Sequence, residues 1–151
     1  MQHYGWRYDY RSRIVSSDML IGEFPVWLQS LGAKLCEAEF FDQMPSQAIV
    51  NEYLPGQGIA MHIDRQCFGP VVATISLGDA WHMNLQPLRE PRSKTKQILL
   101  EVGSVLILSG DARYEWMHGI SSRQREREEH GGWRPRERRL SVTFRTVLPD
   151  Q

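Results

Sequence analysis

The sequence predicts a mainly β (α+β) protein with one or two supporting helices on one side. Three observations lead to this fold class: one stretch of helical apolar spacing near the N-terminus, many short β-prone runs after it, and turn residues between most of those runs. One helix followed by many short strands is typical of a β-sandwich or barrel. Because 151 residues suffice for one core, we expect a single domain over residues 1–151.

The first expected element is a strand within residues 1–10. Tyr4, Trp6, Tyr8 and Tyr10 recur at every second position and would line one face of such a strand. An aromatic face of this kind either packs on a core or stacks on a flat ligand. These rings are therefore candidates for binding a base.

The remaining elements follow from apolar spacing. Apolar residues at helical intervals predict one amphipathic helix from Phe24 to Leu35, with Pro25 in its first turn. Residues 122–138 lack an apolar period and predict an exposed insertion between two strands, either a functional loop or a disordered one. The expected strands are residues 47–53, 71–77, 81–85, 97–102, 104–108 and 140–147.

Charge and cysteine content narrow the function classes. Lys+Arg 18 against Asp+Glu 18 gives a formal net charge of +0, which excludes a strongly basic domain drawn to phosphate by its long-range field. Local basic segments remain, at residues 89–96 and within 122–138. No apolar run approaches the roughly 18 residues of a membrane-spanning helix, and Cys36 and Cys67 form no C-x-x-C pair. We expect a monomer in the cytoplasm that makes no membrane contact.

The most informative motif is His62-Ile63-Asp64. Residues two apart in a strand point to the same face, so the imidazole and the carboxylate would converge. His118, before the 122–138 insertion, is a third candidate ligand. Two histidines and one carboxylate form the facial triad that holds non-haem Fe(II) with open positions. Zinc hydrolases also use two histidines and an acid, so these residues alone leave the metal open.

The last predicted strand favours iron. Its polar–apolar alternation places Arg139, Ser141 and Arg145 on one face, where two guanidinium groups suit a dicarboxylic acid. Asn51 and Tyr53 share a face of another strand and can give further hydrogen bonds. A metal triad combined with a cation pair for a diacid indicates a 2-oxoglutarate-dependent oxygenase, in which the keto acid chelates the metal.

The chain resembles the AlkB family of Fe(II)/2-oxoglutarate dioxygenases, including the branch that contains the tRNA wobble-uridine hydroxylase. The resemblance implies a double-stranded β-helix, or jelly roll, with the metal in its mouth. The matching stretches are Gln2-His3-Tyr4-Gly5, Asn51-Glu52-Tyr53-Leu54-Pro55-Gly56-Gln57-Gly58-Ile59, His62-Ile63-Asp64, Ser76-Leu77-Gly78, residues 110–120 and residues 139–145.

Carried over by position, the resemblance implies the role of each site residue. His62, Asp64 and His118 would bind iron. The far carboxylate of 2-oxoglutarate would contact Arg139, Tyr53 and Ser141, and the carboxylate nearest the metal would contact Arg145 and Asn51. The founding DNA-repair member carries an acidic residue near the damaged base where this chain has Gln66.

The implied reaction is oxidative demethylation or hydroxylation of alkylated DNA or RNA bases, with O2 as oxidant and release of succinate and CO2. The expected substrate is single-stranded or tRNA-like. Candidate substrate contacts are Tyr4, Trp6, Tyr8 and Gln66, because extruded bases are held between aromatic side chains. Three alternatives remain: a tRNA uridine hydroxylase, the same oxidation applied to a protein or small molecule, and a binding module without turnover.

Overall fold

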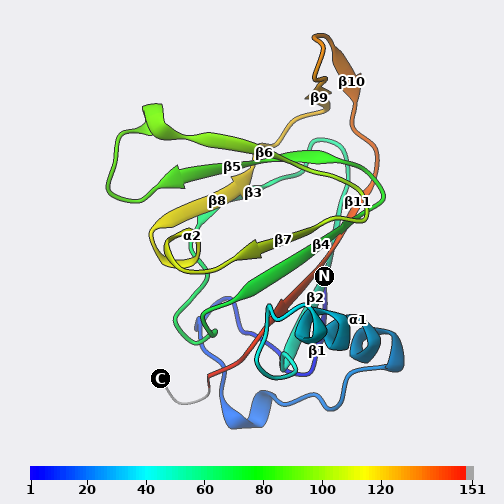
Figure 1. The fold of residues 1–151 in the computed structure, drawn as a ribbon, viewed down its shortest axis with the longest axis vertical. Helices are drawn as coiled ribbons and strands as arrows, with labels where there is room; N and C mark the ends of the chain where they lie inside the picture. Colours follow the sequence, from blue (N-terminus) through cyan, green and yellow to red (C-terminus); the bar gives the residue numbers. More distant parts are fainter. Residues whose placement is uncertain (149–151) are drawn as a thin grey trace.

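The computed structural model describes residues 1–148 and contains two antiparallel sheets, a small hairpin and a helix (Figure 1). The larger sheet has the strand order β1–β2–β11–β4–β7, the second has the order β3–β8–β5–β6, and β9 pairs with β10. This architecture confirms the predicted mainly β fold. The strands are β1 (Gln2–Tyr4), β2 (Gln47–Tyr53), β3 (Ile59–His62), β4 (Val72–Leu77), β5 (Trp81–Pro87), β6 (Lys96–Leu100), β7 (Val105–Leu108), β8 (Trp116–Ile120), β9 (Arg125–Arg127), β10 (Trp133–Pro135) and β11 (Arg139–Arg145).

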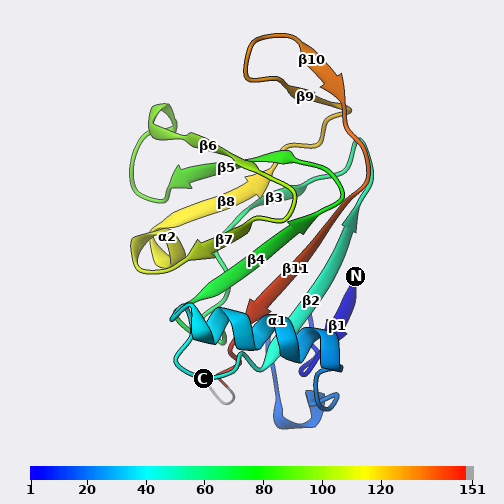
Figure 2. The ribbon, with the colours of Figure 1, turned by 45° about the vertical axis from the view of Figure 1, so that its right-hand side comes forward.

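The helix α1 (Val26–Glu37) covers one face of the larger sheet (Figure 2). Its buried Leu28 and Leu35 pack with Ala48, Val142 and Phe144 of that sheet. A second, four-residue helix α2 (Asp111–Tyr114) precedes β8, and two 3-10 turns lie at Ser17–Met19 and Arg92–Lys94. No helix within residues 1–148 is long and apolar enough to cross a membrane.

Alternation along the strands gives the larger sheet two different faces. In β2, Ala48 packs under the helix, whereas Ile49 and Asn51 line a cavity on the other side. In β11, Phe144 packs under the helix and Arg145 lines the cavity. The period of two that the sequence shows therefore separates an apolar core from a cavity whose wall carries polar side chains.

The expected strand through residues 1–10 is wrong beyond Tyr4. Gly5 has a φ of +73°, and a Cβ added there would lie 2.0 Å from the Ser46 carbonyl oxygen, so only glycine fits this turn. The aromatic residues then separate. The Tyr4 ring meets Trp27 of α1 edge-on, at 5.7 Å between ring centroids, and the Tyr8 ring packs against Phe68 at 5.2 Å.

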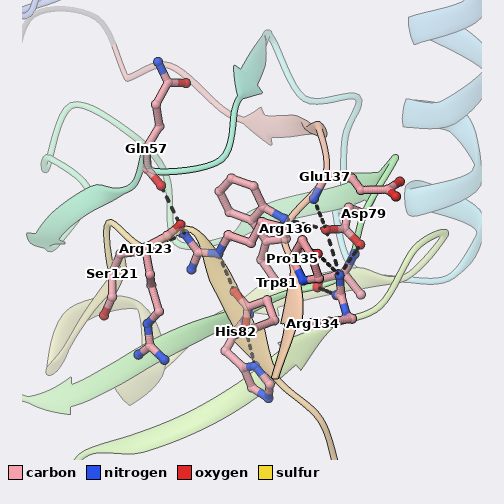
Figure 3. A network of polar contacts seen from close by, with 12 residues as sticks. Gln57, Asp79, Trp81, His82, Ser121, Arg123, Arg134, Pro135, Arg136 and Glu137 are labelled. Carbon is pink, nitrogen blue, oxygen red and sulfur yellow. Dashed lines mark hydrogen bonds and ion pairs between the residues drawn. The ribbon is translucent and has the colours of Figure 1, made fainter. Parts of the chain in front are cut away.

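Residues 122–138 also differ from expectation, because they form the hairpin β9–β10 and not a structureless exposed insertion. Glu126 and Arg136 are 1% and 3% exposed, and the Arg136 Nε donates to Glu126 Oε1 at 2.7 Å. His82 Nδ1 lies 2.6 Å from the other Glu126 oxygen. The Arg136 guanidinium also stacks over the Trp81 ring, with its carbon 4.1 Å from the ring centroid (Figure 3). Sequence patterns miss this hairpin because charged residues, and not apolar ones, attach it to the sheet.

Asp79 forms a second attachment point for the hairpin (Figure 3). Its carboxylate accepts hydrogen bonds from Trp81 Nε1 at 2.9 Å, Arg134 Nη1 at 3.0 Å and the Glu137 amide at 2.8 Å. Although partial burial would raise the pKa of Asp79, these hydrogen bonds lower it below its ordinary value. Asp79 therefore stays ionised and binds both the start of β10 and the segment after it.

Removal of the buried Glu126 carboxylate tests whether it holds the hairpin in place. Glu126→Ala leaves Arg136 buried without its counter-charge, so we expect the free energy of unfolding to fall by about 3 kcal/mol or more. Urea denaturation followed by circular dichroism measures this change. Glu128→Ala, in the exposed turn of the same hairpin, is the control and should change stability little; equal small losses in both variants would contradict the proposed attachment.

Candidate functional site

A cavity of about 650 Å³ lies between the inner faces of the two larger sheets. The larger sheet contributes polar side chains to its wall, and the second sheet contributes His118 with apolar neighbours such as Met83 and Ile120. Nine of the twelve site residues expected from the sequence line this cavity. Those that line the cavity are Tyr8, Asn51, Tyr53, His62, Asp64, His118, Arg139, Ser141 and Arg145.

His62 and His118 converge because they lie directly opposite each other on the antiparallel strands β3 and β8. Their ring centroids are 4.3 Å apart. Gly119 permits this close pairing, since a Cβ there would lie 2.8 Å from the Ile59 carbonyl oxygen of β3. A side chain at position 119 would push the two strands apart.

Asp64 completes the cluster from a loop. The strand β3 ends at His62, so the expectation that His62 and Asp64 share a strand face is wrong. Asp64 Oδ1 nevertheless lies 3.4 Å from His62 Nε2 and 3.6 Å from His118 Nε2. One ligand atom from each of the three residues falls within 4.8 Å of the others. Two imidazoles and a carboxylate at these separations can hold one divalent ion on three adjacent positions.

The protonation states of this cluster suit metal binding. Burial, together with the neighbouring His62, lowers the pKa of His118 to about 4, so its imidazole is neutral. Burial opposes the charge on Asp64, but the hydrogen bond from His62 and the positive charge of Arg145 hold the pKa of this carboxyl well below its usual range. His118 and Asp64 are therefore deprotonated near neutral pH.

The tautomer of His62 follows from its backbone contact. His62 Nδ1 lies 2.8 Å from the Ala60 carbonyl oxygen, which can only accept, so Nδ1 carries the proton. When the ring also carries a proton on Nε2, 3.4 Å from Asp64 Oδ1, that N–H faces the carboxylate. Burial alone would lower the pKa of His62, but the contacts with Asp64 and the Ala60 carbonyl raise it above its ordinary value. A bound divalent cation would displace that proton and use Nε2 as ligand.

Arg145 connects this cluster to the larger sheet. Its Nη1 donates to Asp64 Oδ2 at 3.0 Å, and its Nε donates to Gln47 Oε1 at 3.0 Å. The guanidinium carbon lies 3.7 Å from the centroid of the Phe68 ring. Gln47 in turn donates to the Trp6 carbonyl at 2.9 Å. Asp64 is thus oriented by β11, although it belongs to a loop beyond β3.

Arg113 is a site-forming residue that lies in the matching stretch 110–120 and had no assigned role. It is 2% exposed and donates hydrogen bonds to the carbonyl oxygens of residues 64, 65, 68 and 69 at 2.8 to 3.1 Å. Four backbone carbonyls on one guanidinium fix the loop that carries Asp64. Periodicity could not reveal this role, since a hydrogen-bonded loop leaves no periodic pattern.

At the other end of the inner face of β11 lies Arg139, which is 1% exposed. Its Nη2 donates to Ser76 Oγ at 3.0 Å, and its guanidinium carbon is 5.3 Å from the centroid of the Tyr53 ring. Burial lowers the pKa of Arg139 below its ordinary value, and Tyr53 offsets part of that effect. The side chain still keeps its positive charge in a nearly solvent-free position.

Two buried guanidinium nitrogen atoms indicate which kind of ligand the cavity can bind. Arg139 Nε and Arg145 Nη2 are both buried, and neither has a hydrogen-bond partner within residues 1–148. Buried charged donors almost always have a partner, so an acceptor with negative charge fits this space. Because the two donors come from opposite ends of one strand face, the matching ligand is an anion with two charged ends, such as a dicarboxylate.

The aromatic part of the cavity wall differs from the substrate contacts that the sequence predicts. Tyr8 and Tyr10 line the cavity, with ring centroids 4.7 Å apart and an edge-on arrangement. Arg13 and Arg65 also line it, and Tyr10 is 51% exposed. The expected contacts Tyr4, Trp6 and Gln66 do not belong to this wall: the two aromatic residues pack elsewhere and Gln66 is exposed.

Acidic side chains pair with part of the positive charge of the basic segment at residues 89–96. Lys94 Nζ is ion-paired with Glu90, and Arg89 Nε lies 3.9 Å from a Glu115 oxygen. Lys96 Nζ lies 5.7 Å from the centroid of the Trp116 ring. Only part of its formal charge is therefore available to an external anion.

Comparison with protein families matches residues 2–145 to the family described as the 2OG-Fe(II) oxygenase superfamily. The chain is 36% identical over 148 residues to uncharacterized protein L905 of Acanthamoeba polyphaga mimivirus, covering 95% of this chain and 70% of that protein. It is 34% identical over 126 residues to the Mus musculus tRNA (carboxymethyluridine(34)-5-O)-methyltransferase ALKBH8, covering 82% of this chain but 18% of that protein.

Two further similar proteins match most of this chain. The Danio rerio probable RNA/DNA demethylase ALKBH6 is 28% identical over 152 residues, which cover 85% of this chain and 65% of that protein. Among solved structures, that of OsALKBH1 superposes with a TM-score of 0.64 at 22% identity, covering 96% of this chain and 76% of that chain. This last likeness shows that the fold is shared.

Replacement of Arg113 tests its control of the Asp64 loop. Arg113→Lys keeps the positive charge but cannot contact four carbonyls, so we expect faster amide hydrogen exchange in residues 64–69 and a loss of about 2 kcal/mol in unfolding free energy. Hydrogen exchange read by mass spectrometry measures both the loop and β2. Unchanged exchange in the loop, or equal acceleration in β2, would contradict the assigned role.

Proposed function

Because the chain belongs to the AlkB family within the 2OG-Fe(II) oxygenase superfamily, we propose that it oxidises alkylated nucleic-acid bases. The cofactor of this family is Fe(II), with 2-oxoglutarate and O2 as cosubstrates. One observation supports the assignment to this cavity most strongly. A cluster of two histidines and an aspartate shares the cavity with two buried guanidinium donors that lack partners within the described residues 1–148.

The proposal assigns Fe(II) to His62, Asp64 and His118. All three offer their ligand atoms on the cavity side, and Asp64 is ionised while His118 is neutral. Three protein ligands leave positions for a chelating keto acid and for O2. The neutral imidazoles and single carboxylate also leave a net positive charge on a bound divalent ion, which favours a second anionic ligand.

The proposal assigns 2-oxoglutarate to the inner face of β11 and β2. Arg145, which touches Asp64, lies nearest the metal cluster, so it and Asn51 would bind the carboxylate beside the metal. Arg139, with Tyr53 and Ser141 close to it on the same wall, would bind the far carboxylate. Each arginine has at least one buried donor available for that purpose.

When bound together, Fe(II) and 2-oxoglutarate activate O2 to oxidise a substrate C–H bond, with release of succinate and CO2. The protein's own groups supply position and environment. Arg145 keeps Asp64 in one orientation, and Arg113 keeps its loop in place. The apolar neighbours Met83 and Ile120 keep water away from one side of the cavity.

The residues at the outer wall of the cavity support the proposal that the substrate is a nucleic-acid base. Enzymes that modify bases extrude them from the stack and hold them against aromatic rings. Tyr10, half exposed above the cluster beside Tyr8, offers such a ring, and the exposed Arg13 and Arg65 can contact flanking phosphates. An N-methyl group oxidised here would leave as formaldehyde, whereas a carbon target would stay hydroxylated.

The names of two similar proteins give additional support. One is a tRNA methyltransferase, of which this chain matches only a small part, and the other is a probable RNA/DNA demethylase. Both names refer to nucleic acids, and the first favours tRNA as the alternative substrate. We also propose the reduced cytoplasm as the compartment, because Cys36 and Cys67 are both free thiols.

Nucleic-acid-dependent succinate release tests the proposed function. Purified protein with Fe(II), 2-oxoglutarate and O2 would be given N-methylated DNA and RNA oligonucleotides, tRNA, and unmodified oligonucleotides of the same sequence. We expect succinate release to rise with at least one modified or tRNA substrate above the unmodified controls. Formaldehyde measured in parallel separates demethylation from hydroxylation.

Two variants accompany this experiment. Asp64→Ala removes a proposed iron ligand and should abolish succinate release, whereas Asp111→Ala, exposed at the start of α2, should retain it. Turnover that is independent of nucleic acid, or that increases only with a protein or small-molecule substrate, would overturn the proposed substrate class. Full turnover by Asp64→Ala would overturn the proposed metal ligands.

A further inference from the structure

The hairpin β9–β10 has two faces with different chemistry. Residues directly opposite each other in an antiparallel pair project to the same side, and successive residues alternate. Glu126 pairs with Arg134 in register, and this face is turned to the protein. Arg127 pairs with Trp133, and Arg125 with Pro135, so these four residues share the opposite face.

We propose that this outer face, formed by Arg125, Arg127, Trp133 and Pro135, binds a single-stranded segment of nucleic acid that flanks the target base. This proposal rests on the proposed function, since it identifies where the rest of a nucleic-acid substrate would contact the protein. The indole of Trp133 would stack on a base, and the two guanidinium groups beside it would contact phosphates.

Exposure and charge support this assignment. Trp133 is 55% exposed, and Arg125 and Arg127, two positions apart on β9, are also exposed. Within residues 1–148, neither of these two arginines has an ion-pair partner within 4.0 Å, whereas Arg134, Arg136 and Arg138 each have one. Arg134 and Arg136 therefore attach the hairpin to the protein, while Arg125 and Arg127 stay unpaired within the described residues beside an exposed ring.

The attachment makes this face a fixed surface. Arg136, buried at the base, donates to the carbonyl oxygens of Gln57, Ser121 and Arg123 at 2.9 to 3.2 Å (Figure 3). The Gly56 amide donates to the Arg123 carbonyl at 2.9 Å, which joins the base of the hairpin to the turn before β3. A surface ordered before binding loses less conformational entropy when it binds a ligand.

The position of the hairpin in the chain links it to the cavity. It begins five residues after Ile120 and ends four residues before Arg139, and both of these residues line the cavity. The hairpin stands beyond one end of the two sheets (Figure 2). It would therefore contact nucleotides outside the cavity and not the target base.

Acidic residues in the turn of the hairpin restrict the proposed binding surface to its stem, the paired strands β9 and β10. Glu128 and Glu129 lie in the turn, where the Glu128 amide donates to the Gly132 carbonyl at 3.1 Å. Their carboxylates would repel phosphates at the tip. The nucleic-acid segment is thus expected to cross the stem, at the level of the Arg127–Trp133 pair.

Binding of labelled oligonucleotides tests the outer face. Fluorescence anisotropy with a 20-nucleotide oligouridine RNA and an oligothymidine DNA gives Kd for wild type and variants, and the two probes separate RNA from DNA preference. We expect Trp133→Ala to raise Kd about tenfold and Trp133→Phe to raise it less than about threefold, because a phenyl ring still stacks. Arg125→Ser with Arg127→Ser should make the slope of log Kd against log salt shallower by about 1.4.

The control removes the same charge from the other basic segment. Arg89→Ser with Arg92→Ser should leave Kd within about twofold of wild type if binding is at the hairpin. Circular dichroism of all variants checks that the fold is retained, as expected for changes on an exposed face. Equal weakening by the two double variants would show general electrostatic attraction and would overturn the proposal, as would unchanged Kd in Trp133→Ala.

The proposed function has a separate readout. If wild-type succinate release rises with nucleic acid but the hairpin variants bind as tightly as wild type, only the hairpin proposal fails. If wild-type succinate release is indifferent to nucleic acid while the hairpin variants lose affinity, the substrate proposal fails and the binding face stands. If wild type binds neither oligonucleotide, the hairpin proposal is overturned regardless of turnover.

Discussion

The ion pair between Arg145 and Asp64 connects the two halves of the site. It joins a loop beyond β3 to the middle of the larger sheet through a 3.0 Å contact, with both side chains less than a tenth exposed. A buried charge is costly unless it is paired, so neither residue could keep its position alone. Gln47 and Phe68 fix the guanidinium from two other sides. One donor atom still remains for an anion, and this places the proposed cosubstrate beside the proposed metal.

The strand β11, which carries Arg145, makes this arrangement possible in a chain of 151 residues. β11 lies between β2 and β4, so its backbone is hydrogen-bonded on both sides and its side chains alternate between core and cavity. Phe144 packs under α1 while Arg139 and Arg145 face inward. The apolar side supplies the hydrophobic stabilisation that offsets the burial of two guanidinium groups. The two guanidinium groups of the cavity wall therefore stand on a rigid element and not on a loop.

The sequence predicted those parts of the structure that depend on periodicity. The helix, the central strands and the inward row of β11 follow from apolar spacing, and the motif around His62 and His118 located the cluster. Contacts between distant residues leave no such pattern. The Arg113 contacts to the Asp64 loop and the Glu126–Arg136 pair under the hairpin could not be predicted for this reason. The aromatic alternation of residues 4–10 predicted a strand that ends earlier than expected. Gly5 ends β1, so Tyr8 and Tyr10 line the cavity and Tyr4 does not.

The central claim is that one cavity binds iron and a dicarboxylate side by side, with Arg139 and Arg145 at the two ends of the diacid. The visible charge-transfer band of an Fe(II)–keto acid complex, titrated without oxygen, tests it most directly. 2-Oxoglutarate and 2-oxobutanoate share the chelating end, but only the first has a far carboxylate for Arg139. We expect a band with both acids and a half-saturation concentration at least about thirtyfold higher for 2-oxobutanoate. Equal half-saturation, or no band with 2-oxoglutarate, would contradict the central claim.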